Sequence, residues 1–151
     1  MRHLFDQYSQ PENKLTHALV SSLAQDQKLL RKFVHWSIDQ SIPRKEKLHI
    51  VEQSYPGQEE MAEHESERRG LPDAWIYTDR GWALIIESKV ASGISIDQLN
   101  RHARMARRRG FSMFKILVIN VDITEKRLPN GVFNKSWRDI YEWGSGEAKK
   151  S

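Results

Sequence analysis

Two carboxylates and one lysine stand at a spacing that can bring them together. Asp73 opens one apolar run, and Glu87 and Lys89 close the next. Side chains alternate between the two faces of a strand, so Glu87 and Lys89 are expected on the same face. The short connection between the runs contains Gly81, which supplies the positive φ that a tight hairpin needs. In such a hairpin the start of the first strand lies beside the end of the second, which places Asp73 close to the other two residues.

This combination of groups suits the hydrolysis of a phosphodiester. Mg²⁺ prefers oxygen ligands, polarises a phosphate and acidifies a bound water. Asp73 and Glu87 are therefore the expected metal ligands, and the backbone carbonyl of Ser88 is a further candidate. Lys89 would orient or deprotonate the attacking water, or stabilise charge on the phosphate. The alternative is a salt bridge between neighbouring strands at a sheet edge, which contributes little when exposed.

The elements needed to position these residues can be read from the periodicity of apolar residues. Helices are expected from about residue 11 to 23, from Gln27 to Ile38, from Ser95 to Gly110, and over the short stretch 136–143. Strands are expected over residues 48–55, 73–78, 82–90 and 114–121. The last of these strands is nearly continuously apolar, which is typical of a strand covered on both faces in a central or parallel position.

One α/β domain follows from this order of elements. Residues 1–143 are expected to form a single three-layer domain with a central mixed sheet flanked by helices. Residues 144–151 are polar, rich in glycine and end in lysines, so a flexible tail is predicted there.

The motif and its setting resemble a known family. Pro72-Asp73 is followed after thirteen residues by Glu87-Ser88-Lys89, a pattern similar to the PD-(D/E)xK motif of the restriction-endonuclease-like superfamily. A leading helix, the hairpin, a basic helix and a buried strand give the αβββαβ order of that core over residues 9 to 121. The resemblance implies cleavage of DNA with Mg²⁺ or Mn²⁺, with Asp73 and Glu87 as metal ligands and Lys89 as the catalytic lysine.

The same resemblance suggests two accessory residues. Glu12 on the leading helix would reach the site as an accessory acid, and Gln98 would touch metal or substrate. Helix capping offers another explanation for both, because Ser9 with Glu12 and Ser95 with Gln98 each form a capping-box pattern.

Basic residues are concentrated in the C-terminal part of the chain. Residues 1–96 hold 12 basic and 14 acidic side chains, whereas residues 97–151 hold 12 basic and 6 acidic ones. Arg101, Arg104 and Arg108 share one face of the expected helix and are candidates for clamping phosphates. An ordinary solvated helix face is the alternative. His102 lies one turn after Gln98 and could assist at the site, but it is interpreted as a lone surface histidine.

Composition limits the remaining function classes. The chain has no cysteine, so a metal site must use oxygen or imidazole ligands, and a cytoplasmic location is expected. The longest apolar run, residues 82–86, is too short to span a bilayer, so no membrane partner is expected. Besides a DNA nuclease, the sequence leaves open a catalytically idle module that binds nucleic acid or self-associates as a homodimer. It also leaves open the nuclease domain of a longer protein.

Overall fold

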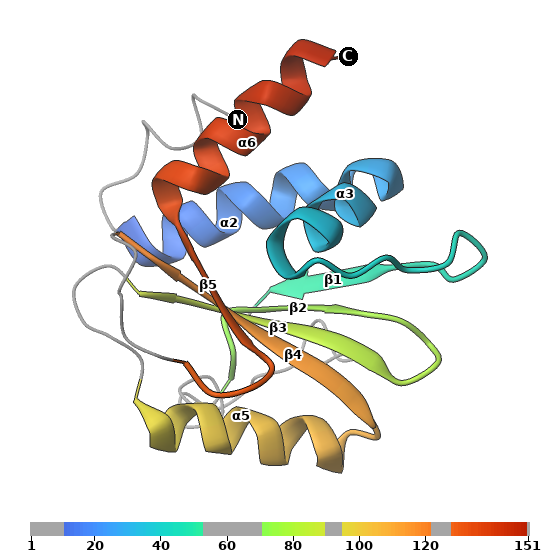
Figure 1. Ribbon diagram of the computed structural model, residues 1–151, viewed down its shortest axis with the longest axis vertical. Coiled ribbons are helices and arrows are strands. Elements are labelled where there is room, and N and C mark those ends of the chain that lie inside the picture. The colour runs from blue at the N-terminus through green and yellow to red at the C-terminus, as the bar shows by residue number, and fades with distance from the viewer. Residues whose placement is uncertain (1–10, 53–70, 90–94, 122–127, 151) are drawn as a thin grey trace.

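The chain folds into an α/β structure built on one mixed sheet (Figure 1). The computed structural model describes residues 11–52, 71–89, 95–121 and 128–150, and within them the side chains of all but residues 11–13 and 89. In chain order the elements are α2 (Pro11–Ala24), α3 (Gln27–Ile38), β1 (His49–Glu52), β2 (Ala74–Tyr77), β3 (Trp82–Lys89), α5 (Ile96–Arg108), β4 (Met113–Asn120), β5 (Val132–Ser136) and α6 (Trp137–Lys150).

The five strands lie in the order in which they occur in the chain. β2 pairs antiparallel with both β1 and β3, whereas β4 pairs parallel with both β3 and β5. The predicted hairpin is confirmed: β2 and β3 pair with Ala74 opposite Ile86, and Gly81 in the turn has a φ of 89°. The predicted central, parallel position of the strand around residues 114–121 is also confirmed.

Helices cover both faces of the sheet, so the arrangement has three layers. Figure 1 shows α2, α3 and α6 on one face and α5 on the other. Each face has its own apolar cluster. The first joins Leu19, Phe33 and Ile86 to the start of α6, and the second joins Ile85 to Leu99 of α5.

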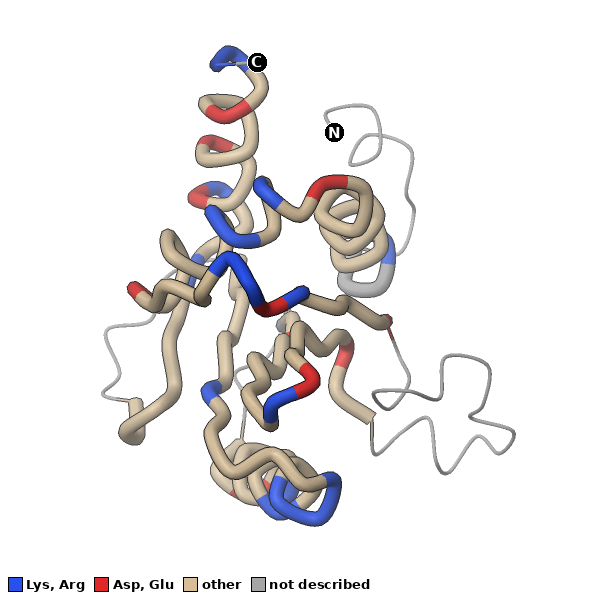
Figure 2. The backbone as a smooth tube through the Cα atoms, turned by 90° about the vertical axis from the view of Figure 1, so that its right-hand side faces the viewer, with Lys and Arg blue, Asp and Glu red and all other residues tan. Residues whose placement is uncertain are grey.

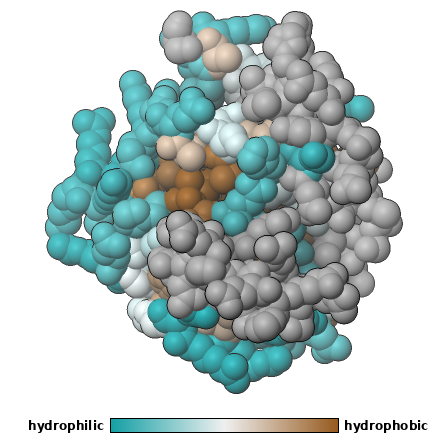
Figure 3. Space-filling model, turned by 180° about the vertical axis from the view of Figure 1, so that it is seen from behind, coloured by the Kyte–Doolittle hydropathy of each residue, from teal (hydrophilic) through white to brown (hydrophobic). Residues whose placement is uncertain are grey.

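Polar side chains and glycine set the ends of the helices; the cap at Ser95 and the end at Gly110 were predicted, whereas the cap at Asp26 was not. Asp26 caps the N-terminus of α3 by accepting hydrogen bonds from the backbone N–H groups of residues 28 and 29. Ser95 caps α5 in the same way, and Gly110 follows that helix with a φ of 90°. Figure 2 colours Lys and Arg blue, and such residues occur on the segment before β1 and toward the end of α5. Seen from behind relative to Figure 1, the described residues show an apolar area bordered by hydrophilic side chains (Figure 3).

Two elements near the C-terminus differ from the prediction. Strand β5 was not predicted. Helix α6 does not end at Trp143 but continues to Lys150, so the predicted flexible tail is wrong for residues 144–150. Packing explains the longer helix, because the Trp143 ring stacks on that of Trp36 in α3 with centroids 5.4 Å apart. The predicted cap at Ser9 and the end of the strand predicted over residues 48–55 lie outside the described residues.

None of the helices in the described part of the chain is both long and apolar enough to cross a membrane.

Candidate active site

The candidate residues meet at the carboxyl end of the central strand β3. Ala74 pairs with Ile86, so Asp73, which directly precedes β2, stands next to Glu87 at the following position. The antiparallel hairpin thus brings the two acidic residues to adjacent strands, as the sequence predicts. On its other side β3 pairs with β4, and Lys89 lies opposite Asn120.

The carboxylate of Glu87 is held by two side chains of α5. Gln98 donates from Nε2 to Oε1 over 3.0 Å, and Nε2 of His102 lies 2.9 Å from Oε2. Glu87 is only 4% exposed and His102 only 2%. A buried carboxylate requires partners of this kind, since burying it without them is costly.

Helix geometry explains why these two residues act together. Residues 98 and 102 are four positions apart and therefore lie one turn above the other on the same helix face. The interpretation of His102 as a surface histidine is wrong, because this face packs against the sheet. The capping-box explanation of Gln98 is also wrong in part: Ser95 does cap the helix, but the Gln98 side chain reaches Glu87.

Asp73 makes a different set of contacts, centred on Ser88. Oδ2 of Asp73 accepts a hydrogen bond from the backbone N–H of Ser88 over 2.7 Å and another from its hydroxyl over 3.0 Å. That hydroxyl lies 2.8 Å from Oγ1 of Thr16 in α2. Thr16 is buried and was not predicted from the sequence as a site residue, and this contact connects α2 to the candidate site. A role of the Ser88 carbonyl as a metal ligand remains a prediction.

Two further buried polar atoms near this end of the sheet have no hydrogen-bond partner among the described residues. They are Oδ1 of Asn120, at the end of β4, and Nδ1 of His102. Asn120 is two positions after Val118, so both side chains lie on the same face of β4. Val118 packs with Ile85 on the α5 side of the sheet. Both atoms are buried polar groups of the kind that normally have partners. A single polar residue ending an apolar strand was the only signal for Asn120 in the sequence.

Two predicted residues can be located by backbone alone. Glu12 lies in the first turn of α2, and Lys89 is the last residue of β3. Their side chains are outside the described part of the structure, so their catalytic roles remain predictions.

The three arginines predicted to hold phosphate lie on α5 and are exposed to solvent. Arg101, Arg104 and Arg108 lie on the side of the helix away from the buried residues Leu99 and His102. They therefore do not contact the sheet, and a role in holding phosphate remains a prediction.

The oxygen ligands at this site suit Mg²⁺ in their chemistry. Asp73 and Glu87 provide carboxylates from neighbouring strands, and Asn120 adds a buried amide oxygen that has no hydrogen-bond partner among the described residues. Metal-binding carboxylates are themselves commonly held by hydrogen bonds such as those to Asp73 and Glu87. Among the described side chains, no group of three or more acidic or histidine residues is arranged to hold a metal ion, so such a site would draw on Asn120, water or substrate for further ligands.

No protein-family model, curated protein or solved structure matches this chain.

Proposed function

We propose that this protein is a metal-dependent nuclease that hydrolyses DNA phosphodiester bonds and has the restriction-endonuclease-like form of the α/β fold. The main support is the position of Glu87. Its buried carboxylate lies at the carboxyl end of the central strand, beside Asp73, and is oriented by Gln98 and His102. Buried acidic residues that are held by specific polar partners are found preferentially at active sites.

In this proposal Asp73 and Glu87 hold Mg²⁺ or Mn²⁺ at the end of the hairpin. The metal would polarise the scissile phosphate and lower the pKa of a bound water. Gln98 and His102 fix the orientation of Glu87, and the Ser88 N–H and hydroxyl fix that of Asp73. Lys89 orients or deprotonates the attacking water, or stabilises charge on the phosphate.

The rival function is a catalytically idle module that binds nucleic acid. One observation favours it: both carboxylates are already held by donors from within the chain. An idle module needs no such carboxylates to retain its fold, because a buried ion pair can often be replaced as a whole by well-packed apolar residues without loss of stability. For this reason we favour the nuclease.

Cleavage assays with matched variants distinguish the two functions. The substrates are plasmid, linear duplex and single-stranded DNA, and RNA, each with Mg²⁺ or Mn²⁺. Asp73→Asn and Glu87→Gln should each lower the cleavage rate at least about a hundredfold, because even the outer partners of metal ligands typically contribute 10–100-fold.

Asp79→Asn is the control for this experiment. It makes the same chemical change at the turn of the same hairpin, where the side chain is 81% exposed, and should leave cleavage unchanged. Equal cleavage by all four proteins would rule out the proposed site. Binding of DNA by the wild type without cleavage under either metal would instead establish the idle module.

A further inference from the structure

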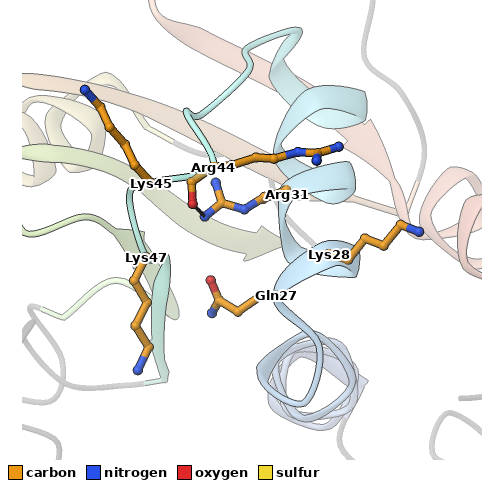
Figure 4. A pocket seen from close by; sticks show the side chains of 6 residues that line it. All are labelled: Gln27, Lys28, Arg31, Arg44, Lys45 and Lys47. Carbon is orange, nitrogen blue, oxygen red and sulfur yellow. Dashed lines mark hydrogen bonds between the residues drawn. The ribbon is translucent and has the colours of Figure 1, made fainter.

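A second charged feature lies at the other end of the sheet. A hollow of about 560 Å³ is lined by one glutamine and five cationic residues (Figure 4): Gln27, Lys28, Arg31, Arg44, Lys45 and Lys47. Three of them belong to the segment that enters β1, whose first residue pairs with the last residue of β2, near the hairpin turn. Glu87 lies at the opposite end of β3, so this basic hollow is separate from the candidate active site.

Arg31 holds the wall of the basic hollow in place. Its guanidinium donates to the backbone carbonyls of Ile42, Pro43, Arg44 and Glu46. Gln27 reinforces the wall through both of its side-chain polar atoms, which bond to the N–H and carbonyl of residue 48. The segment from 42 to 48 is therefore fixed against α3 before any ligand arrives, and the donors of Arg31 are committed to this task.

The remaining four cations face solvent. Lys28, Arg44, Lys45 and Lys47 are all exposed, and in Figure 4 their side chains extend around Gln27 and Arg31. Within the described part of the chain none of the five cations forms a salt bridge; Lys32, close by on the same helix, does, with Glu147. Like charges gathered on a fixed surface create a positive potential that attracts anions.

The lining residues indicate which anion would bind. None of them is apolar, whereas a surface that docks on a membrane also buries apolar side chains. The one neutral polar residue, Gln27, is occupied by the backbone, so no group is left to read a base edge. Separate cations spread over an open surface match a chain of phosphates, which is contacted without regard to sequence.

We propose that the basic hollow binds the phosphate backbone of nucleic acid at a distance from the site of cleavage. The proposal rests on the proposed function in its choice of nucleic acid as the polyanion. Binding here would hold a long substrate on the protein through contacts that do not take part in the reaction. Its test requires no cleavage, so it can fail or succeed independently of the nuclease.

The test measures binding of a fluorescent 30-base-pair duplex to the full chain in EDTA, over a series of salt concentrations. The variant Arg44→Gln/Lys45→Gln/Lys47→Gln should raise the Kd by about tenfold at low salt. It should also reduce the slope of log K against log salt by about 2 to 3, since each duplex phosphate contact contributes about 0.9.

The control removes the same charge elsewhere. Arg80→Gln/Arg138→Gln/Lys149→Gln neutralises three exposed cations outside the basic hollow and should change the slope by less than about 1. Thermal unfolding of both triple variants shows that they are folded.

Two results would overturn the inference. One is an equal Kd and slope for the wild type and the Arg44, Lys45 and Lys47 variant. The other is a preference for a different polyanion, seen as tighter binding to poly-glutamate or to phosphatidylserine vesicles than to DNA at equal salt. If the wild type binds DNA in a salt-dependent way but does not cleave it, the result contradicts the proposed nuclease function and leaves the proposed role of the basic hollow intact.

Discussion

Nε2 of His102 lies 2.9 Å from Oε2 of Glu87, and both side chains are almost fully buried between α5 and the sheet. The two residues come from elements on different layers, and their contact ties the helix to the central strand. Its role in stability can be tested separately from any catalytic role.

Removing the imidazole should destabilise the fold. His102→Ala takes a partner from a buried carboxylate, which we expect to lower the free energy of unfolding by about 3 kcal/mol. In a double-mutant cycle with Glu87→Ala, the two losses should couple by at least about 1 kcal/mol, because the double variant leaves no buried acid behind. Urea denaturation provides the measurement.

An exposed pair of the same types serves as the comparison. Nε2 of His49 lies 3.1 Å from Oδ1 of Asp79 at the surface. The corresponding cycle should give less than about 1 kcal/mol of coupling, since water already solvates both groups. Additive losses for His102 and Glu87 would show that their contact does not contribute to stability.

Replacing Gln98 should weaken the binding of metal more than it destabilises the fold. Under the proposed nuclease function, Gln98→Ala removes the amide donor to Oε1 of Glu87 and loosens the orientation of the carboxylate. We expect the Mg²⁺ concentration for half-maximal cleavage to rise about 10–100-fold, as measured in a metal titration. Asn100→Ala, at an exposed position two residues along the same helix, is the control. An unchanged titration for Gln98→Ala would remove Gln98 from the site.

Gly146 tests whether α6 continues beyond Trp143. It lies inside the helix, and a Cβ added there would meet nothing within 4 Å. Gly146→Ala should therefore raise the free energy of unfolding by about 0.5–1 kcal/mol. Gly131→Ala also has open space but needs a φ of 80°, so it should lower stability by about 1 kcal/mol. No change for Gly146→Ala in thermal unfolding would mean that the helix is not formed there in solution.

Glu147 should make the attachment of α6 sensitive to acid. Its hydrogen bond to Lys32 in α3, with the nearby charge of Lys150, lowers the pKa of the Glu147 carboxyl below its ordinary value. A lowered folded-state pKa stabilises the protein above the unfolded-state pKa, and this stabilisation is lost as the pH falls through the folded-state value.

The expected size of this effect is at most about 1 kcal/mol, because Lys32 is partly exposed. Wild type should be more stable than Glu147→Gln near pH 7, and the difference should shrink as the pH falls below the ordinary range for Glu and through the lowered folded-state pKa. Unfolding free energies measured as the pH is lowered provide the test. A difference that does not change with pH would contradict the assignment of the pKa shift to this contact.

Local patterns in the sequence were enough to predict much of the framework. The hairpin of β2 and β3, with Gly81 in its turn, is encoded by two apolar runs and a glycine. The start of α5 is encoded by Ser95, and the buried parallel position of β4 by a continuous apolar run. These features were predictable because each depends on residues that are neighbours in the chain. The adjacency of Asp73 and Glu87 followed from the hairpin.

Other elements depend on contacts that no local pattern contains. β5 includes Asn134 and Lys135, which are uncommon in strands, so its own sequence gives little indication of a strand. In the described part of the chain, β5 is held by pairing with β4. The end of α6 contains glycines that disfavour a helix, and it is held by stacking of Trp143 on Trp36. In both cases tertiary packing overrides weak local propensity.

The sequence by itself therefore determined the hairpin strands β2 and β3 and the acidic residues that they carry to the candidate site, and the tertiary structure decided what surrounds them. His102 reaches Glu87 only because α5 packs with that face on the sheet. Thr16 meets Ser88 across 72 positions of the chain. Periodicity predicts that a helix has a buried face, but which strand residue each buried side chain meets is fixed only when the layers pack together.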